Sequence, residues 1–215
     1  FPDLAMAVAM ADPNVIIGKN ADFIEFTAFD NVEKGFNDTR IGSPVFESRG
    51  QDNGFGYTWV DSDEENGPIF SFNDISASGT NITAQVGGDG TTQITLPFPF
   101  EFYGEVYENV FVNANGFISF EPVPGFGTFV NSQIPTENGI NGIIAGLWDD
   151  LEPQEGNGAL YVAEVNNSLV FQWSNVERFF RPADQTVTFQ IIINSDGNID
   201  ILYSDVETAE FLDEA

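Results

Sequence analysis

The stretch Thr188-Phe-Gln-Ile-Ile-Ile-Asn-Ser-Asp-Gly-Asn-Ile-Asp-Ile-Leu-Tyr203 decides the fold class of this sequence. Phe189, Ile191 and Ile193 occupy alternate positions, so they share one face of an extended chain. Asp196-Gly197 follows, and residues of this kind tolerate the positive φ angles that tight hairpin turns require. The stretch therefore predicts a β-hairpin with one apolar face.

Short apolar runs of this kind recur through most of the chain, separated by turn residues such as Gly, Asn and Asp. Helical periodicity is almost absent from the same region. Many short strands with such turns are typical of a β-sandwich. We predict an all-β fold, a jelly-roll-like antiparallel sandwich. Its predicted strands are residues 57–60, 69–72, 81–86, 92–96, 100–102, 106–113, 116–120, 143–147, 159–165, 169–173, 187–193 and 199–204.

Residues 1–53 differ from the rest and are predicted to form an N-terminal extension to a sandwich domain at residues 54–215. Residues 4–11 are apolar, too few for a membrane span and too uninterrupted for an amphipathic helix. They predict either a short buried helix or an extended segment that another surface covers. Strand-like runs at residues 14–18 and 23–29 precede a polar connection that reaches residue 53.

The 215 residues include 34 Asp and Glu, 6 Lys and Arg, no His and no Cys. Without imidazole or thiol, this chain lacks the groups needed for Ser-His-Asp or Cys-His catalysis and for the usual zinc sites. Its formal charge of -28 repels nucleic-acid phosphates and anionic lipid headgroups, which proteins bind through clustered Lys and Arg. We therefore predict no nucleic-acid partner. No run of 18 apolar residues occurs, so we also predict no membrane insertion.

The basic residues are concentrated at the N-terminal end. Four of the six precede residue 50, and Arg178 and Arg181 are the other two. Eighteen carboxylates lie between Gly50 and Glu177 with no positive side chain among them. Divalent cations, ambient salt or a basic partner must screen these charges. The simplest interpretation is a solvated acidic surface adapted to salt. The functional interpretation is that these carboxylates bind cations.

Residues 61–67 read Asp-Ser-Asp-Glu-Glu-Asn-Gly and form the densest acidic loop. Oxygen ligands on a flexible loop are what Ca2+ prefers, so we predict Asp61, Asp63 and Glu65 as ligands. The EF-hand pattern is not met, because Asn66 and Phe72 stand where its Gly and its bidentate Glu belong. A solvated acidic turn is the alternative.

A second acidic stretch, Trp148-Asp-Asp-Leu-Glu152, follows an apolar run. Asp149, Asp150 and Glu152 are predicted as a second set of Ca2+ ligands. A carboxylate pair for glycoside hydrolysis is an alternative. Adjacent strand residues point to opposite faces, however, so Asp149 and Asp150 would need a third carboxylate. Structural capping of the strand end is the remaining interpretation, with Trp148 in the core.

Five segments with distinctive motifs occur in a fixed order along the chain. The segments are Gly56-Tyr-Thr-Trp-Val-Asp-Ser-Asp-Glu-Glu-Asn-Gly-Pro68, Leu96-Pro-Phe-Pro-Phe-Glu-Phe-Tyr-Gly104, Val110-Phe-Val-Asn-Ala-Asn-Gly-Phe-Ile-Ser-Phe120, Ile143-Ile-Ala-Gly-Leu-Trp-Asp-Asp-Leu151 and Phe189-Gln-Ile-Ile-Ile-Asn-Ser-Asp-Gly-Asn-Ile199. Their order resembles that of a bacterial extracellular β-sandwich module of secreted proteases and surface adhesins, which is similar in motif order to nidogen-like extracellular domains. The resemblance covers residues 54–204 and implies a non-catalytic accessory module. It does not extend to the apolar N-terminal segment, and the closing strand of the module is not evident after residue 204.

Aromatic residues provide two further candidates. Phe98, Phe100 and Phe102 alternate, which favours an inter-sheet core over a sugar-stacking platform. Arg178 and Arg181 flank Phe179-Phe180 and offer a contact for the acidic surface of a neighbouring subunit. An amphipathic turn between strands is the alternative there.

The leading hypothesis is a non-enzymatic module, secreted or at the cell surface, that works in adhesion or subunit assembly with Ca2+ in one or both acidic loops. Its partners are other subunits or a surface ligand. An apolar N-terminal segment suits strand donation between filament subunits, with Leu4, Met6, Val8 and Met10 as donor side chains. Docking of residues 1–18 on their own domain is the alternative. The alternative functions are polysaccharide binding within a secreted enzyme and a carboxylate-only glycosidase.

Overall fold

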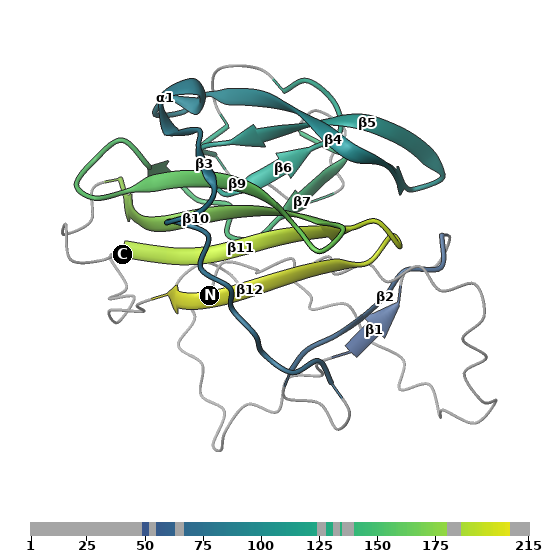
Figure 1. Ribbon diagram of the computed structural model, residues 1–215. Helices are drawn as coiled ribbons and strands as arrows, with labels where there is room; N and C mark the ends of the chain where they lie inside the picture. Colours follow the sequence, from purple (N-terminus) through teal and green to yellow (C-terminus); the bar gives the residue numbers. More distant parts are fainter. Residues whose placement is uncertain are drawn as a thin grey trace, which may run out of the picture.

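Two antiparallel β-sheets face each other in the computed structural model of this chain (Figure 1). The structure describes residues 49–51, 55–62, 67–123, 128–130, 134, 140–179 and 186–206. Within these residues the helical content is a single turn, α1 (Thr83–Val86). The predicted all-β antiparallel sandwich is confirmed. The N-terminal extension lies outside the described residues except for residues 49–51, so its predicted boundary stays a prediction.

The larger sheet has six strands in the order β12-β11-β10-β9-β3, with β8 paired to the C-terminal end of β10. The predicted hairpin at residues 188–203 is β11–β12, in which Ile193 lies opposite Ile199 and Gly197 has a φ of 90°. The prediction of this hairpin is confirmed. The strands are β3 (Thr80–Asn81), β8 (Leu151–Glu152), β9 (Ala159–Val165), β10 (Ser168–Arg178), β11 (Thr186–Asn194) and β12 (Ile199–Val206).

The smaller sheet has four strands in the order β4-β5-β6-β7. Its longest strand joins two predicted strands into one, with an irregular register between Thr95 and Phe100. Pro97 and Pro99 stand in that interval, and proline has no N–H to donate to a neighbouring strand. The strands are β4 (Thr91–Phe102), β5 (Glu105–Asn113), β6 (Phe117–Ser119) and β7 (Ile143–Ala145). A separate pair consists of β1 (Arg49–Gln51) and β2 (Thr58–Val60).

The core fills the space between the two sheets, and Trp173 on β10 is its largest fully buried side chain. The Trp173 ring stacks on that of Phe189, with 4.8 Å between centroids and 7° between planes. The Trp173 Nε1–H donates to the carbonyl oxygen of Ala114, 3.0 Å away in the turn after β5. A side chain of one sheet therefore hydrogen-bonds to the backbone of the other.

Two strand predictions are wrong. Residues 69–72 have β-branched and aromatic side chains but form no strand, because no neighbouring strand in the described part pairs with them. Residues 81–86 divide instead into β3 and α1. The Asn81 Oδ1 accepts the Thr83 N–H at 3.0 Å, and Ile82 and Val86 are both buried at the four-residue spacing of a helix. Neither β1 nor β8 was predicted.

A pair of buried glutamines holds a covering segment on the outer face of the larger sheet. Phe171, Trp173 and Phe189 face the core, so Gln172 and Gln190, which are register partners, face outward. The Gln190 Nε2 donates to Gln172 Oε1 at 2.7 Å and to the carbonyl oxygen of residue 73 at 2.8 Å.

The Gln172 Oε1 also accepts the Ile75 N–H at 3.0 Å, and its Nε2 donates to Asp74 Oδ1 at 2.7 Å. We call this arrangement of Gln172, Gln190 and residues 73–75 the glutamine clamp. Both glutamines are almost fully buried because residues 73–75 cover them.

Candidate functional site

The structure describes five of the residues predicted from sequence to bind metal or to contact another subunit. Asp61 directly follows β2, and Asp149, Asp150, Glu152 and Arg178 lie together at one end of the larger sheet. The other predicted site residues lie outside the described residues: Leu4, Met6, Val8, Met10, Asp63, Glu65 and Arg181.

The turn between β5 and β6, residues 113–116, is buried and forms the base of this site. The Asn113 Oδ1 accepts the Asn115 N–H at 2.8 Å, a local Asx turn, while Asn113 Nδ2 donates to the carbonyl oxygen of Gly90 at 3.0 Å. The Asn115 Nδ2 donates to Thr128 Oγ1 at 3.0 Å and to Asp89 Oδ1 at 3.3 Å. Two asparagines therefore join three separate loops.

Residues 146–151, which follow β7, hydrogen-bond to the same turn. The carbonyl oxygen of Gly116 accepts the N–H groups of residues 146 and 147, at 3.0 and 3.2 Å. The Asn115 carbonyl oxygen accepts the Asp149 N–H at 3.3 Å, and Asn115 Oδ1 accepts the Leu151 N–H at 2.9 Å. Uncharged amide groups thus fix the backbone of the acidic loop.

Trp148 lies at the edge of the core and not within it, in contrast to the sequence prediction. Its side chain is partly exposed, and its ring packs against Phe117 with 5.3 Å between centroids. The Trp148 Nε1–H donates to the carbonyl oxygen of Thr128 at 2.6 Å. An indole N–H needs such an acceptor, which places the ring at the rim of the apolar core.

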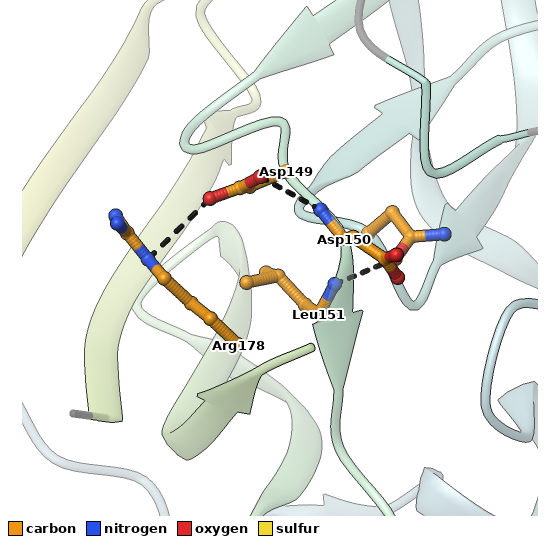
Figure 2. Close-up of polar contacts among 5 residues, drawn as sticks. Asp149, Asp150, Leu151 and Arg178 are labelled. Atoms are coloured by element: carbon orange, nitrogen blue, oxygen red, sulfur yellow. Dashed lines mark hydrogen bonds and ion pairs between the residues drawn. The ribbon is translucent and has the colours of Figure 1, made fainter. Parts of the chain in front are cut away.

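Asp149 is turned toward Arg178 at the end of β10 (Figure 2). Its Oδ2 lies 3.5 Å from the Arg178 Nε, with the two side chains 42% and 14% exposed, and its Oδ1 accepts the Asp150 N–H at 2.9 Å. A long, single contact from an exposed carboxylate contributes roughly 0–1 kcal/mol. Arg178 therefore has an ion-pair partner in its own chain, and its predicted contact with another subunit stays a prediction.

Asp150 and Glu152 lie in a concentration of negative charge. Burial raises the pKa of the Asp150 carboxyl, and the charges of Asp89 and Asp149 raise it further. Burial also raises the pKa of the Glu152 carboxyl, followed by the charges of Glu155, Asp150, Asp89 and Glu177. We call these six residues, Asp89, Asp149, Asp150, Glu152, Glu155 and Glu177, the acidic cluster.

The acidic cluster attracts cations electrostatically, but its carboxylates do not converge on one point. Within the described ranges, no group of three or more His, Cys, Asp or Glu side chains is placed to hold a metal ion. Asp149 faces Arg178, and Asp63 and Glu65 of the first loop are not described. The predicted Ca2+ ligands stay predictions. Chemically, the arrangement raises the local concentration of cations near residues 149–152.

The acidic cluster should make stability depend on pH in a specific direction. A carboxyl whose pKa is raised by folding destabilises the native state above that pKa. As pH falls from 7 toward the ordinary carboxyl range near pH 4, the native state binds protons first and stability rises. We expect Asp150→Asn with Glu152→Gln to unfold at a higher temperature than wild type at pH 7, with this difference shrinking as pH falls.

Thermal unfolding between pH 7 and pH 4, in chelator, measures this difference. Asp200→Asn is the control, because Asp200 is exposed on β12 and is not part of the acidic cluster. A gap between the double variant and wild type that does not change with pH would contradict the expectation.

Aromatic side chains gather at the tip of the β4–β5 hairpin. Phe100 and Phe102 are buried and Phe98 packs against them, so the predicted core role is confirmed. Tyr103 turns the hairpin with a φ of 50°, and its ring packs against that of Phe55. The two residues are 41% and 62% exposed. An exposed ring surface suits a sugar or a protein partner equally, and the polysaccharide ligand stays a prediction.

The fold and the buried turn at residues 113–116 define a β-sandwich module, and the Asn-Ala-Asn-Gly motif of that turn has a structural role. The family model described as NIDO related matches residues 65–214, well over half of the chain. The chain therefore belongs to the NIDO-related family. Comparisons with curated proteins and with solved structures gave no match.

Membership of this family confirms the nidogen-like part of the resemblance and indicates an extracellular kind of β-rich module. The bacterial origin and the link to proteases and adhesins stay predictions. Among the described helices, none is long and apolar enough to cross a membrane.

Asn113 and Asn115 organise this site and were not predicted from sequence as site residues. The available signal was the Asn-Ala-Asn-Gly sequence itself, since an Asn before Gly marks a turn and two asparagines in one turn supply several side-chain donors and acceptors. Their partners are 13 to 36 residues away along the chain, and no local pattern identifies them.

Proposed function

We propose that this chain is a non-catalytic extracellular module that works in adhesion or in the assembly of subunits, including extracellular filaments. The observation that carries the proposal is the uncompensated acidic surface. No basic side chain occurs between Gly50 and Glu177, and Arg178, which follows, lies against Asp149. Such a surface favours a basic protein partner or bound cations. The lack of His and Cys supports a role without catalysis.

The N-terminal segment supports assembly over binding of an unrelated ligand. Residues 1–49 hold four of the six basic residues against eight Asp and Glu, so this part of a subunit carries less net negative charge per residue than the sandwich and is repelled less by the sandwich of another subunit. Leu4, Met6, Val8 and Met10 alternate with alanines, which is the pattern of a strand with one large apolar face. Addition of a strand to a neighbouring subunit is a common mode of protein association.

Deletion of residues 1–18 tests the assembly proposal. We expect the full chain to form oligomers in sedimentation velocity, and the deletion variant to sediment as a monomer with an unchanged urea unfolding midpoint. The matched control for chain length is a full-length variant with serine at positions 4, 6, 8 and 10. It keeps the length and charge of the chain and removes only the apolar face. A deletion variant that associates like the full chain would refute the proposal.

We also propose that Ca2+ stabilises the module at residues 61–65, at residues 149–152, or at both. A ligand that binds only the native state stabilises it by about 2.7 kcal/mol at a concentration of 100 Kd. For a domain of this size, that is a rise of roughly 5–10 °C in the unfolding temperature. Calorimetry in calcium and in chelator measures it, with NaCl at equal ionic strength as the control for screening. Equal unfolding temperatures in calcium and in chelator would remove calcium from the proposal.

A further inference from the structure

Residues 69–72, Ile-Phe-Ser-Phe, are strand-like in composition but belong to no helix, turn or strand in the described structure. Their backbone N–H and C=O groups make no hydrogen bond among the described contacts. Figure 1 shows this stretch within the tube, drawn without arrow or coil, that leads into β3. A row of backbone donors and acceptors without partners is a template for another strand.

The side chains of this segment are exposed to an unusual degree. Ile69 is 93% exposed and Phe70 is 54% exposed, the first being the largest value among the large apolar side chains of the described part. The ring of Phe70 stacks on that of Phe72, with 6.4 Å between centroids and 23° between planes. Because these apolar side chains are neighbours, they form one patch instead of isolated exposed groups. Exposed apolar patches mark interaction sites.

The segment is also held at one end. The glutamine clamp fixes the residues that immediately follow it, and the Asp74 Oδ1 accepts the Ser76 N–H at 2.9 Å. Pro68 precedes the segment, and proline limits both its own φ angle and the conformations of the residue before it to extended ones. A segment that is already held in place loses less conformational entropy when a strand pairs with it.

We propose that residues 69–72 receive residues 4–10 of a second copy of this chain as an added β-strand. This inference rests on the proposed assembly function and names its acceptor. The donor carries no charged residue between Asp3 and Asp12, so its apolar side chains meet Ile69 and Phe70 without like-charge contacts to Asp61 or Asp74. Pairing supplies hydrogen bonds to the backbone of residues 69–72 and cross-strand apolar pairs to its side chains.

The geometry predicts an open assembly. Donor and acceptor are different segments of the chain, so the contact is head-to-tail, and each added subunit still presents a free acceptor. Contacts of this kind build filaments unless the rotation between subunits closes a ring.

The first experiment compares two acceptor variants of the full chain in sedimentation velocity. Ser71→Pro removes a backbone N–H that is unbonded in the single chain, so the fold should persist while the added strand is blocked. Ile69→Asp introduces a charge at the patch, and Val130→Asp is its control because Val130 is 60% exposed elsewhere. We expect at least a tenfold weaker association for the two acceptor variants and wild-type association for the control.

The second experiment uses cysteine crosslinking, for which the chain is suited because it has no Cys. Copies with Met6→Cys are mixed with copies with Phe70→Cys and oxidised. A disulfide requires Cα atoms within about 7 Å, so a mixed dimer identified by mass supports the inference. A variant with both cysteines that closes a disulfide within one chain would overturn it, because the acceptor is then covered by its own N-terminal segment.

The outcomes separate this inference from the proposed function. If both acceptor variants associate like wild type and the deletion of residues 1–18 abolishes association, the donor pairs elsewhere and only the inference fails. If the deletion also has no effect, or if the wild-type chain is monomeric, both fail. Should Ser71→Pro not fold, Ile69→Asp with its control decides the question.

Discussion

Replacement of Gly116 by alanine is expected to destabilise the protein by about 2–5 kcal/mol. Gly116 has a φ of 86°, a left-handed conformation that costs an L-residue with a Cβ roughly 1–2 kcal/mol. A Cβ there would also lie 1.8 Å from the carbonyl oxygen of Leu147. The backbone of residues 146–151 must then move, and forced shifts of this kind cost about 1–3 kcal/mol. Urea unfolding followed by tryptophan fluorescence measures the loss.

Gly142→Ala is the matched control for this prediction. Gly142 also has a positive φ, 66°, but a Cβ added there meets no atom within 4 Å. We expect this variant to lose only the conformational part, roughly 1–2 kcal/mol. If Gly116→Ala costs no more than Gly142→Ala, the close approach of residues 116 and 147 does not hold the acidic loop as described.

Trp173→Ala is expected to cost about 3–5 kcal/mol, because it empties the centre of the core. Trp173 is fully buried, stacks on Phe189 and bonds to the carbonyl oxygen of Ala114. Trp173→Phe keeps an aromatic ring and removes the donor, so about 1–3 kcal/mol should be lost through the unsatisfied carbonyl and the smaller volume. Denaturant unfolding of both variants distinguishes the contributions. A Phe variant as stable as wild type would show that the hydrogen bond between the sheets contributes nothing.

Strands whose apolar residues alternate were predictable from sequence, because alternation is a property of neighbouring residues in the chain. The β11–β12 hairpin is the clearest case, since the alternation at residues 189–193 and the Asp-Gly turn are contained within sixteen consecutive residues. Residues 69–72 have a similar composition and form no strand. Composition reports how well side chains suit a sheet, but a strand also needs a partner, and sequence does not show where one lies.

The grouping of the acidic residues was predictable from sequence, but their contacts were not. The acidic residues 149, 150 and 152 are adjacent in sequence, and their grouping was therefore visible. Two features depend on elements far apart along the chain. One is the contact between Asp149 and Arg178, and the other is the effect of the Asp89 charge on the pKa of Asp150 and Glu152. The residue that fixes this loop, Asn115, is a neutral side chain 36 positions from Leu151, so neither charge nor spacing identified it.

The glutamine clamp has a consequence for the order in which the chain folds. Residues 73–75 bond to partners 97 to 117 positions further along, so they cannot dock until β10 and β11 exist. Contacts this distant in sequence slow folding, because a long loop must close before they form. Ile69 and Phe70 are exposed both before and after this docking, and until then the segment that carries them is not held against the sheet. The carboxylates at positions 61, 63, 64, 65 and 74 flank that stretch and act as gatekeepers, since local charge opposes aggregation of apolar segments.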